Sequence, residues 1–167
     1  MNLGGGLTGM SGAGKTTAGR ILANIRGARF VDTDDIIQNQ SGSKLNELVL
    51  KDERAFLKTE EKILLSVDLS DNPVVATGGS AIYSPRAMKY FRDSAHVIFL
   101  DVPLPILVKR VRPDGRGIVG LGRKTYAELA KERRILYELF SDFTLRIEKD
   151  TPEETAKAIA DILGTLK

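Results

Sequence analysis

Residues 9–16 carry the clearest chemistry in the chain, because they read GMSGAGKT and complete the pattern G-x-x-x-x-G-K-[ST] of a phosphate-binding loop. The glycines let the backbone turn tightly and aim successive N–H groups at phosphate oxygens. Lys15 adds a positive charge for the β and γ phosphates, and Thr16 offers a hydroxyl to Mg²⁺. Apolar residues at helical spacing follow, so a helix N-terminus also faces the anion. The motif predicts binding of a nucleoside triphosphate.

Two carboxylates, Asp32 and Asp34, follow a predicted strand at 29–32. In an open parallel sheet, the carboxyl ends of the strands form the ligand-binding edge. Side chains at i and i+2 of an extended segment share a face. We therefore interpret one carboxylate as a partner of Mg²⁺ and the other as the group that meets an acceptor hydroxyl. The alternative is that this segment only caps the following helix, with no chemistry.

A second glycine pair, Gly78-Gly79, follows the predicted strand 73–77. Glycines permit close approach of the backbone to a ligand, although an ordinary strand-to-helix turn uses the same residues. We expect this pair to lie beside the phosphate-binding loop.

The positions of these motifs agree with an α/β fold in which short apolar runs alternate with helical segments. We predict strands at 3–8, 29–32, 73–77, 96–101 and 143–147, and helices at 15–26, 52–67, 84–92, 103–111, 123–139 and 152–166. The first strand contains three glycines, which either admit close packing of helices or are tolerated because a central strand is held from both sides. The length of 167 residues fits a single domain.

Composition narrows the function classes. The chain has no cysteine, which excludes disulfides, Cys-ligated zinc and thiol catalysis. Its longest apolar runs are the size of strands, far below the roughly 20 residues of a membrane helix, so we expect a cytoplasmic protein, and we expect a monomer. The net charge of +3 is mild and aromatic residues make up 6%. Basic residues gather between positions 110 and 134, and a small phosphorylated ligand explains them as well as a nucleic acid does. No nucleic-acid-binding motif accompanies them, so we expect no nucleic-acid partner.

Taken together, the motifs resemble the shikimate kinase family over nearly the full length. The resemblance rests on residues 9–16, Asp32-Thr33-Asp34, Phe56 with Glu60, Gly78-Gly79, Arg116, and Arg133 with Tyr137. It implies a three-layer P-loop fold with a five-stranded parallel sheet in the order 2-3-1-4-5. It also implies a single kinase domain over 1–167, with a substrate-binding helical region at about 33–62 and a mobile lid at about 112–124.

The resemblance assigns a nucleotide side to the site. ATP and Mg²⁺ are the implied cofactors, with Thr16 and Asp32 on the metal and Arg116 of the lid reaching the phosphates. Arg110 and Pro152 match the positions that sandwich the adenine ring. The residues implied to bind ATP are Gly12, Ala13, Gly14, Lys15, Thr16, Thr17, Arg110, Arg116 and Pro152.

An acceptor side is implied as well. Asp34 would contact the acceptor hydroxyl, Gly78 and Gly79 would line the acceptor pocket, and Arg133 would hold the acceptor's carboxylate. The catalytic residues are then Lys15, Asp34 and Arg116. The implied reaction is phosphoryl transfer from ATP to shikimate, a small-molecule substrate.

One departure concerns the acceptor. The family carries Phe-Arg-x-x-Glu in its substrate-binding helix, where the arginine grips the carboxylate and the glutamate steadies the arginine. Here Leu57 stands at the arginine position. Loss of one charge-assisted contact costs roughly 1.5–3 kcal/mol. Arg54 or Lys58 could supply a displaced cation. A related kinase for gluconate, another polyol acid or a nucleoside monophosphate is therefore the alternative.

The lid is the second departure, because the chain reads RGIVGLG from Arg116 onward. Three glycines predict a flexible flap that closes over ATP and excludes water. The alternative is a surface loop in which Arg116 has no role in the reaction. A function of a different class, a nucleotide-sensing binding protein, would have no need for the acceptor carboxylate pair.

Overall fold

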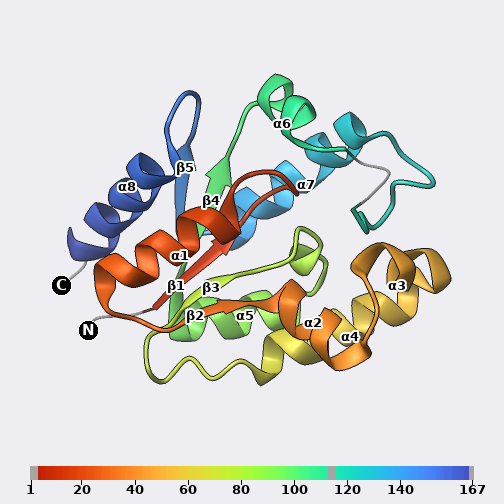
Figure 1. Cartoon of the computed structure of the whole chain (residues 1–167), viewed down its shortest axis with the longest axis horizontal. Coiled ribbons are helices and arrows are strands. Elements are labelled where there is room, and N and C mark those ends of the chain that lie inside the picture. Colours follow the sequence, from red (N-terminus) through yellow and green to blue (C-terminus); the bar gives the residue numbers. More distant parts are fainter. Residues whose placement is uncertain (1–3, 113–115, 166–167) are drawn as a thin grey trace.

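The computed structural model describes residues 4–112 and 116–165. A five-stranded parallel sheet forms its centre, in the order β2-β3-β1-β4-β5 (Figure 1). The strands are β1 (Gly4–Thr8), β2 (Phe30–Asp32), β3 (Val74–Ala76), β4 (Ala95–Asp101) and β5 (Phe143–Arg146). The predicted fold class and strand order are confirmed. Leu3, at the start of the predicted first strand, lies outside the described residues.

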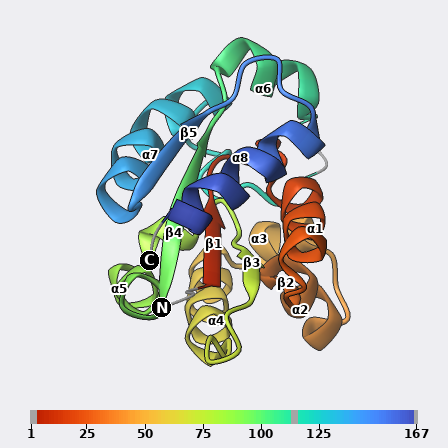
Figure 2. The same ribbon diagram turned by 90° about the vertical axis from the view of Figure 1, so that its left-hand side faces the viewer.

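Helices cover both faces of this sheet. They are α1 (Lys15–Arg26), α2 (Thr33–Ser41), α3 (Leu45–Lys51), α4 (Glu53–Ser66), α5 (Pro85–Ser94), α6 (Leu104–Arg110), α7 (Tyr126–Phe140) and α8 (Pro152–Thr165), with a 3₁₀ turn at Ala81–Tyr83. Helices α1 and α8 lie against each other on one face, and α5 and α7 cover the other (Figure 2). Helices α2, α3 and α4 form a separate group beside the sheet (Figure 1).

The glycines of β1 are explained by packing. A Cβ atom on Gly5 would lie 3.2 Å from Cδ1 of Leu163 in α8, and one on Gly6 would lie 3.2 Å from Cδ1 of Phe91 in α5. A Cβ on Gly4 would lie 2.5 Å from the carbonyl oxygen of Pro73. Close packing of helices on both faces of the central strand is therefore the reason for the run of glycines.

Two helices were missing from the predicted set. Helices α2 and α3 are short, and Gly42, which has φ 68°, ends α2. Their apolar residues join a small second core, formed by Ile37, Val49, Phe56, Ile63 and Val119. Because Val119 comes from the loop after Arg116, this core connects the predicted lid to the helical region.

Candidate active site

The phosphate-binding loop connects β1 to α1, as the motif predicts. Gly9, Gly12 and Gly14 have φ angles of 146°, 90° and 91°, which residues with a Cβ adopt only with strain. A Cβ on Gly12 would also lie 2.3 Å from Cγ2 of Val111. Helix α1 begins directly after Gly14 without a side-chain cap, so its first N–H groups remain available for an anion.

Lys15 bends back over this loop. Its ammonium donates hydrogen bonds to the carbonyl oxygens of Gly9 and Met10, at 2.7 Å and 2.9 Å. Burial lowers the pKa of Lys15 to about 8, while the charges of Asp34 and Asp32 oppose that shift. The ammonium is thus held at the loop by weak neutral partners, which phosphate oxygens can replace.

Thr16 and Asp32 form a direct pair. The Thr16 hydroxyl donates to Oδ2 of Asp32 at 2.6 Å. The other oxygen of Asp32 caps α2, because Oδ1 accepts from the backbone N–H groups of Asp34 and Asp35 at 3.0 Å and 3.4 Å. The capping interpretation therefore holds for Asp32, while its role at a metal stays a prediction.

Asp34 lies in the first turn of α2, so the prediction of two carboxylates along one extended segment is wrong. The helix starts one residue after the strand ends because Asp32 satisfies its first N–H groups. Burial, and then the charge of Asp32, raise the pKa of Asp34 to about 6, against the opposing effect of Lys15. Asp34 therefore changes charge close to neutral pH.

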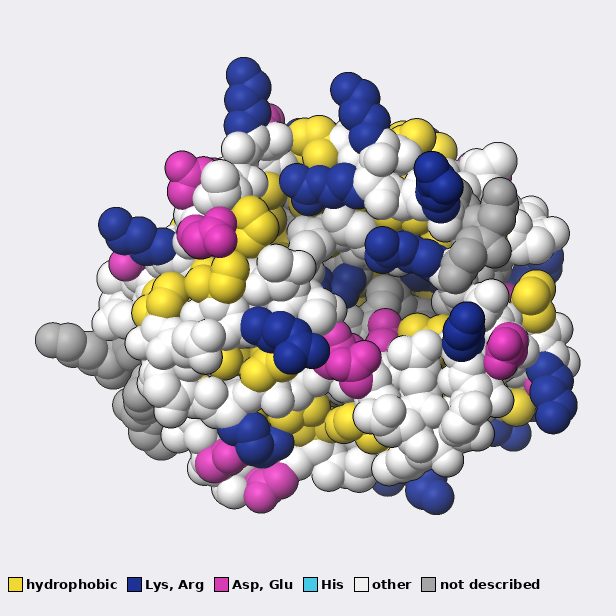
Figure 3. All heavy atoms as spheres, in the orientation of Figure 1, with side chains coloured by type: hydrophobic (Ala, Val, Ile, Leu, Met, Phe, Trp, Pro, Cys, Tyr) yellow, Lys and Arg dark blue, Asp and Glu magenta, His cyan; other side chains and the backbone are white. Residues whose placement is uncertain are grey.

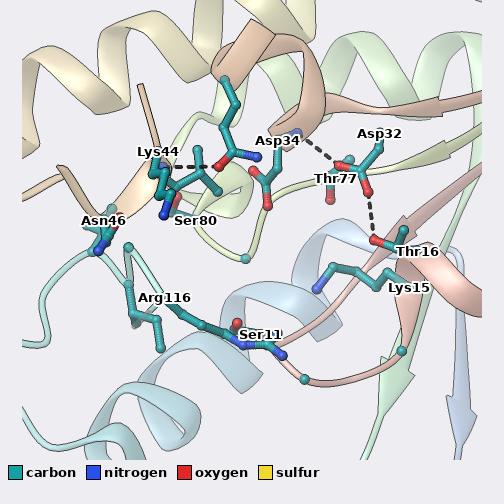
Figure 4. A pocket seen from close by; sticks show the side chains of 18 of the residues that line it. Ser11, Lys15, Thr16, Asp32, Asp34, Lys44, Asn46, Thr77, Ser80 and Arg116 are labelled. Carbon is teal, nitrogen blue, oxygen red and sulfur yellow. Dashed lines mark hydrogen bonds between the residues drawn. The ribbon is translucent and has the colours of Figure 1, made fainter. Parts of the chain in front are cut away.

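A single cavity of about 540 Å³ joins these groups. The space-filling view shows a hollow on this face, with Lys, Arg, Asp and Glu side chains around it (Figure 3). In the close-up, Lys15, Thr16 and Asp32 lie at one end, Lys44 and Asn46 lie at the other, and Asp34 lies between them (Figure 4). The cavity has two ends of different chemistry, one at the phosphate-binding loop and one at the helical group.

Most of the predicted site residues line this cavity: Gly12, Gly14, Lys15, Thr16, Thr17, Asp32, Asp34, Gly79, Arg110, Arg116 and Arg133. Three predicted residues do not. Ala13 is buried in the turn of the loop, and Gly78 lies behind the cavity against Asp34 and Glu60. Pro152 is the exposed first residue of α8, and its adenine contact stays a prediction.

Arg133 is buried to 1% exposure although it carries a charge. Its guanidinium donates to the carbonyl oxygen of Val119 at 2.6 Å and to the hydroxyl of Tyr83 at 3.2 Å, and it lies over the Tyr83 ring. A Cβ on Gly79 would lie 3.3 Å from Nη1 of Arg133. No carboxylate among the described residues pairs with this guanidinium, so it can receive an anion from the cavity.

The side chain of Leu57 does not line the main cavity. Leu57 packs against the second core and lines a smaller cleft of about 250 Å³ together with Arg54 and Lys58. Neither cation lines the main cavity, and their role as substitutes for the missing arginine stays a prediction. Glu60 is buried instead beside Ser80, whose hydroxyl donates to its Oε2 at 2.6 Å, and its Oε1 has no hydrogen-bond partner among the described residues.

Burial raises the pKa of Glu60 to about 7, the hydrogen bond from Ser80 opposes this, and the charge of Asp34 adds to it. A Cβ on Gly78 would lie 2.4 Å from Oε1 of Glu60 and 2.7 Å from Oδ1 of Asp34. A residue with a Cβ would force these two carboxyl groups to shift. Gly78 therefore matters for their spacing rather than as a lining residue.

The segment after Arg116 packs against the helical group. Ile118 and Val119 are 7% and 4% exposed. The N–H of Gly120 donates to Oε2 of Glu53 at 2.8 Å, and Arg123 pairs with the same carboxylate. Arg116 lines the cavity, which argues against an idle arginine, while the flexibility of this segment stays a prediction. Residues 113–115 of the predicted lid lie outside the described residues.

Sequence reasoning missed several residues that hold the site. The hydroxyl of Tyr126 donates to the carbonyl oxygen of Ser11, and that of Tyr137 donates to the carbonyl oxygen of Gly79, both at 2.6 Å. Both tyrosines lie on α7, and no local pattern in the sequence reveals bonds to residues this distant. Arg134 pairs with the buried Asp101.

The remaining lining residues come mainly from the helical group and its neighbours: Ser11, Gln38, Lys44, Leu45, Asn46, Phe56, Thr77, Ser80, Gly117, Ile118 and Val119. Of these, Lys44 carries a charge, and nothing in the sequence indicated it beyond its place within the predicted substrate-binding region at about 33–62. No helix of the described residues has the length and hydropathy that a membrane span requires.

Comparison with known proteins identifies the family. The family model "Shikimate kinase" matches residues 11–164. The chain belongs to the shikimate kinase family. It is 35% identical to shikimate kinase of Synechococcus elongatus, over 96% of this chain and 86% of that protein. It is 32% identical to shikimate kinase of Histophilus somni, over 96% of this chain and 95% of that protein.

A solved shikimate kinase has the same fold. The enzyme from Acinetobacter baumannii, in complex with shikimate, superposes with a TM-score of 0.87 at 27% identity, over 99% of this chain and 96% of that one. A gluconokinase from Sinorhizobium meliloti is more distant, with a TM-score of 0.53 at 18% identity, and shares the fold alone. As a shikimate kinase family member, the chain is an ATP-dependent kinase that phosphorylates a small acceptor.

Proposed function

We propose that this kinase transfers the γ-phosphoryl group of ATP to a hydroxyl of shikimate, with Mg²⁺ as the metal. The observation that carries the proposal is the single cavity that contains Lys15 and Thr16 at one end and Asp34 and Arg133 on the acceptor side. A phosphate donor and a hydroxylated carboxylic acid can both bind in that space. This arrangement suits a transfer in which positioning and electrostatics supply the catalysis.

The metal site consists of the Thr16 hydroxyl and the Asp32 carboxylate. These are hard oxygen donors 2.6 Å apart beside the phosphate-binding loop, and Mg²⁺ prefers such donors together with phosphate oxygens and water. We assign Thr16 to the metal directly and Asp32 to its outer shell. When bound, the ion neutralises negative charge on the β and γ phosphates.

Asp34 acts as the acceptor group for the hydroxyl proton. With a pKa of about 6, it is largely ionised at pH 7 and still basic enough to accept a hydrogen bond from the attacking hydroxyl. Lys15 and Arg116 stabilise the charge that spreads over the transferred group. Arg133, held by Tyr83 and by the Val119 carbonyl, orients the acceptor through its carboxylate.

Further assignments belong to the same proposal. Arg110 contacts the adenine, since its Cβ lies beside Gly12 of the phosphate-binding loop, and Pro152 covers the other side of the ring. The chain works as a single kinase domain, with the helical region at about 33–62 as the acceptor side and residues 112–124 as a lid that closes on it. A monomeric state and a cytoplasmic location stay predictions.

Another polyol acid, such as gluconate, is the second candidate for the acceptor. The observation that favours it is Leu57, which stands at the family's arginine position, does not line the cavity and cannot bind a carboxylate. A nucleoside monophosphate would need further cations for its phosphate. A nucleotide-sensing protein would have no need for an acceptor site, whereas Asp34 and Arg133 both line the same cavity as the phosphate-binding loop.

The test is a coupled assay of ADP release with ATP and Mg²⁺, run without acceptor and with shikimate, gluconate, other sugar acids and nucleoside monophosphates. We expect strong stimulation by shikimate, and no turnover by Lys15→Ala, which controls for contaminating kinases. If another compound stimulates ADP release and shikimate does not, that compound is the acceptor instead of shikimate. ADP release that no acceptor stimulates would favour the sensing protein.

A further inference from the structure

The acceptor end of the cavity holds a cation that none of the family motifs includes. Lys44 precedes α3 and lines the cavity together with Asn46, which lies beside it (Figure 4). The other cations of the lining are Lys15, Arg110, Arg116 and Arg133. Lys15 belongs to the phosphate-binding loop, and Arg110 lies beside Gly12 of that loop. Lys44 is therefore a charge supplied by the helical group itself.

The Lys44 ammonium is available to a ligand. Among the described residues, it makes no hydrogen bond and no ion pair, although its backbone N–H donates to Glu47 at 3.2 Å. Arg133, by contrast, is already held by Tyr83 and by the Val119 carbonyl. An exposed lysine beside a cavity retains its charge and its reach.

Local structure gives no reason for a lysine here. Lys44 is the N-cap of α3, a position that favours Ser, Thr, Asp or Asn, because their oxygens accept the first N–H groups of the helix. A lysine offers no acceptor, and its charge faces the positive end of the helix dipole. The residue is thus unfavourable for the helix that it starts, which is understandable where its charge serves a ligand.

The segment after Arg116 brings this position against the cavity. Gly117 packs so closely on the backbone of Leu45 and Asn46 that a Cβ there would lie 2.5 Å from the Leu45 carbonyl oxygen. Arg116 and Lys44 therefore approach the same end of the cavity from opposite segments (Figure 4). Leu57, Arg54 and Lys58 instead line the smaller cleft.

We propose that Lys44 binds the carboxylate of the acceptor. Beside Arg133, it supplies the second positive charge that the family's arginine provides at the position of Leu57. This inference rests on the proposed function, since it requires a carboxylate acceptor. It makes Lys44 a specificity-determining residue of this chain: the enzyme would retain selectivity for a hydroxy acid while lacking the arginine of the family motif.

The experiment compares Lys44→Ser with Lys58→Ser as a matched control, because Lys58 lies on α4 and lines the other cleft. Serine restores a preferred N-cap in the first variant, so thermal stability should be retained or rise. We expect Lys44→Ser to raise the KM for shikimate about tenfold to a hundredfold, the loss of one charge-assisted hydrogen bond. The KM for ATP should change less than about twofold, and Lys58→Ser should resemble the wild type in both.

A second measurement removes the charge from the ligand. Wild type and Lys44→Ser are compared with shikimate and with its methyl ester, and the ester should penalise the wild type more than the variant. An unchanged KM for shikimate in Lys44→Ser, or equal ester penalties in both proteins, would overturn the role of Lys44 while leaving the proposed function standing. If the wild type phosphorylates no carboxylic acid at all, both proposals fail together.

Discussion

Gly117 offers the sharpest test of whether the packing of the segment after Arg116 on the helical group supports turnover. A Cβ there would lie 2.5 Å from the carbonyl carbon and oxygen of Leu45 and 2.7 Å from the backbone nitrogen of Asn46. Nonbonded carbon atoms prefer about 3.5–4.0 Å, so the two backbones must separate by about 1 Å. Gly117 lies outside the positive-φ region, so Gly117→Ala introduces this contact without backbone strain.

Overpacking of this kind costs about 1–3 kcal/mol. That range corresponds to a roughly 5- to 150-fold lower equilibrium constant for the packed arrangement of this segment on Leu45 and Asn46. Because Arg116 precedes Gly117 and Ile118 and Val119 follow it, the loss should appear in turnover. We expect kcat/KM for the acceptor to fall within that range in the ADP-release assay. Binding of an ATP analogue, measured by calorimetry, should weaken less, since the added Cβ meets Leu45 and Asn46 of the helical group first.

Gly122→Ala is the matched control, because a Cβ at Gly122 meets nothing within 4 Å. It changes the same loop by the same atom and should leave kinetics and thermal stability unchanged. If Gly117→Ala matched this control in kcat/KM, the contact with Leu45 and Asn46 would have no role in turnover, and the reasoning would be refuted.

Three further predictions concern buried groups. Glu60→Gln should stabilise the protein at pH 8 and not at pH 4. The pKa of Glu60 is raised from 4.5 to about 7, so its contribution to stability is present below pH 4.5 and is lost as the pH rises through 7. At pH 8 the wild type must bury a charged carboxylate, whereas glutamine stays neutral. Urea unfolding at both pH values measures this, and an equal effect at both would contradict it. Tyr137→Phe removes the donor to the half-buried carbonyl of Gly79 and should cost about 0.5–1.5 kcal/mol of unfolding free energy; an unchanged urea midpoint would show that another group satisfies that carbonyl. The ionised form of Asp34 is needed for transfer, so kcat/KM should fall as the pH drops below about 6, and above about 8 it should fall again as Lys15 loses its proton; a flat profile between pH 5 and 7 would exclude Asp34 as the proton acceptor.

Local signals in the sequence were sufficient for most of the fold. Helix α1 begins at Lys15 and ends at Arg26, as predicted from the apolar spacing, and the described strands lie within one or two residues of their predicted bounds. The phosphate-binding loop is equally local, because its glycine spacing is set by the φ angles of one turn. Helices α2 and α3 were missed because they are short and gain their stability from the shared second core.

The acceptor side depended on tertiary structure. The sequence named Asp34 and Arg133, but α2 rather than an extended segment carries Asp34, since the Asp32 side chain caps that helix. It suggested Arg54 or Lys58 as substitutes for the arginine absent at position 57, whereas both line a different cleft. Helical periodicity cannot tell which of two cavities a side chain faces when the neighbouring helices come from distant segments.

By itself, then, the sequence determined the P-loop fold, the nucleotide side and the membership of a kinase family, because these depend on glycine spacing, apolar periodicity and charges close together in the chain. Only the tertiary structure decided that Lys44 reaches the acceptor end and that Tyr126 and Tyr137 hold Ser11 and Gly79. These contacts join residues up to 115 positions apart, and their geometry is fixed by the packing of α7 and of the helical group on the sheet.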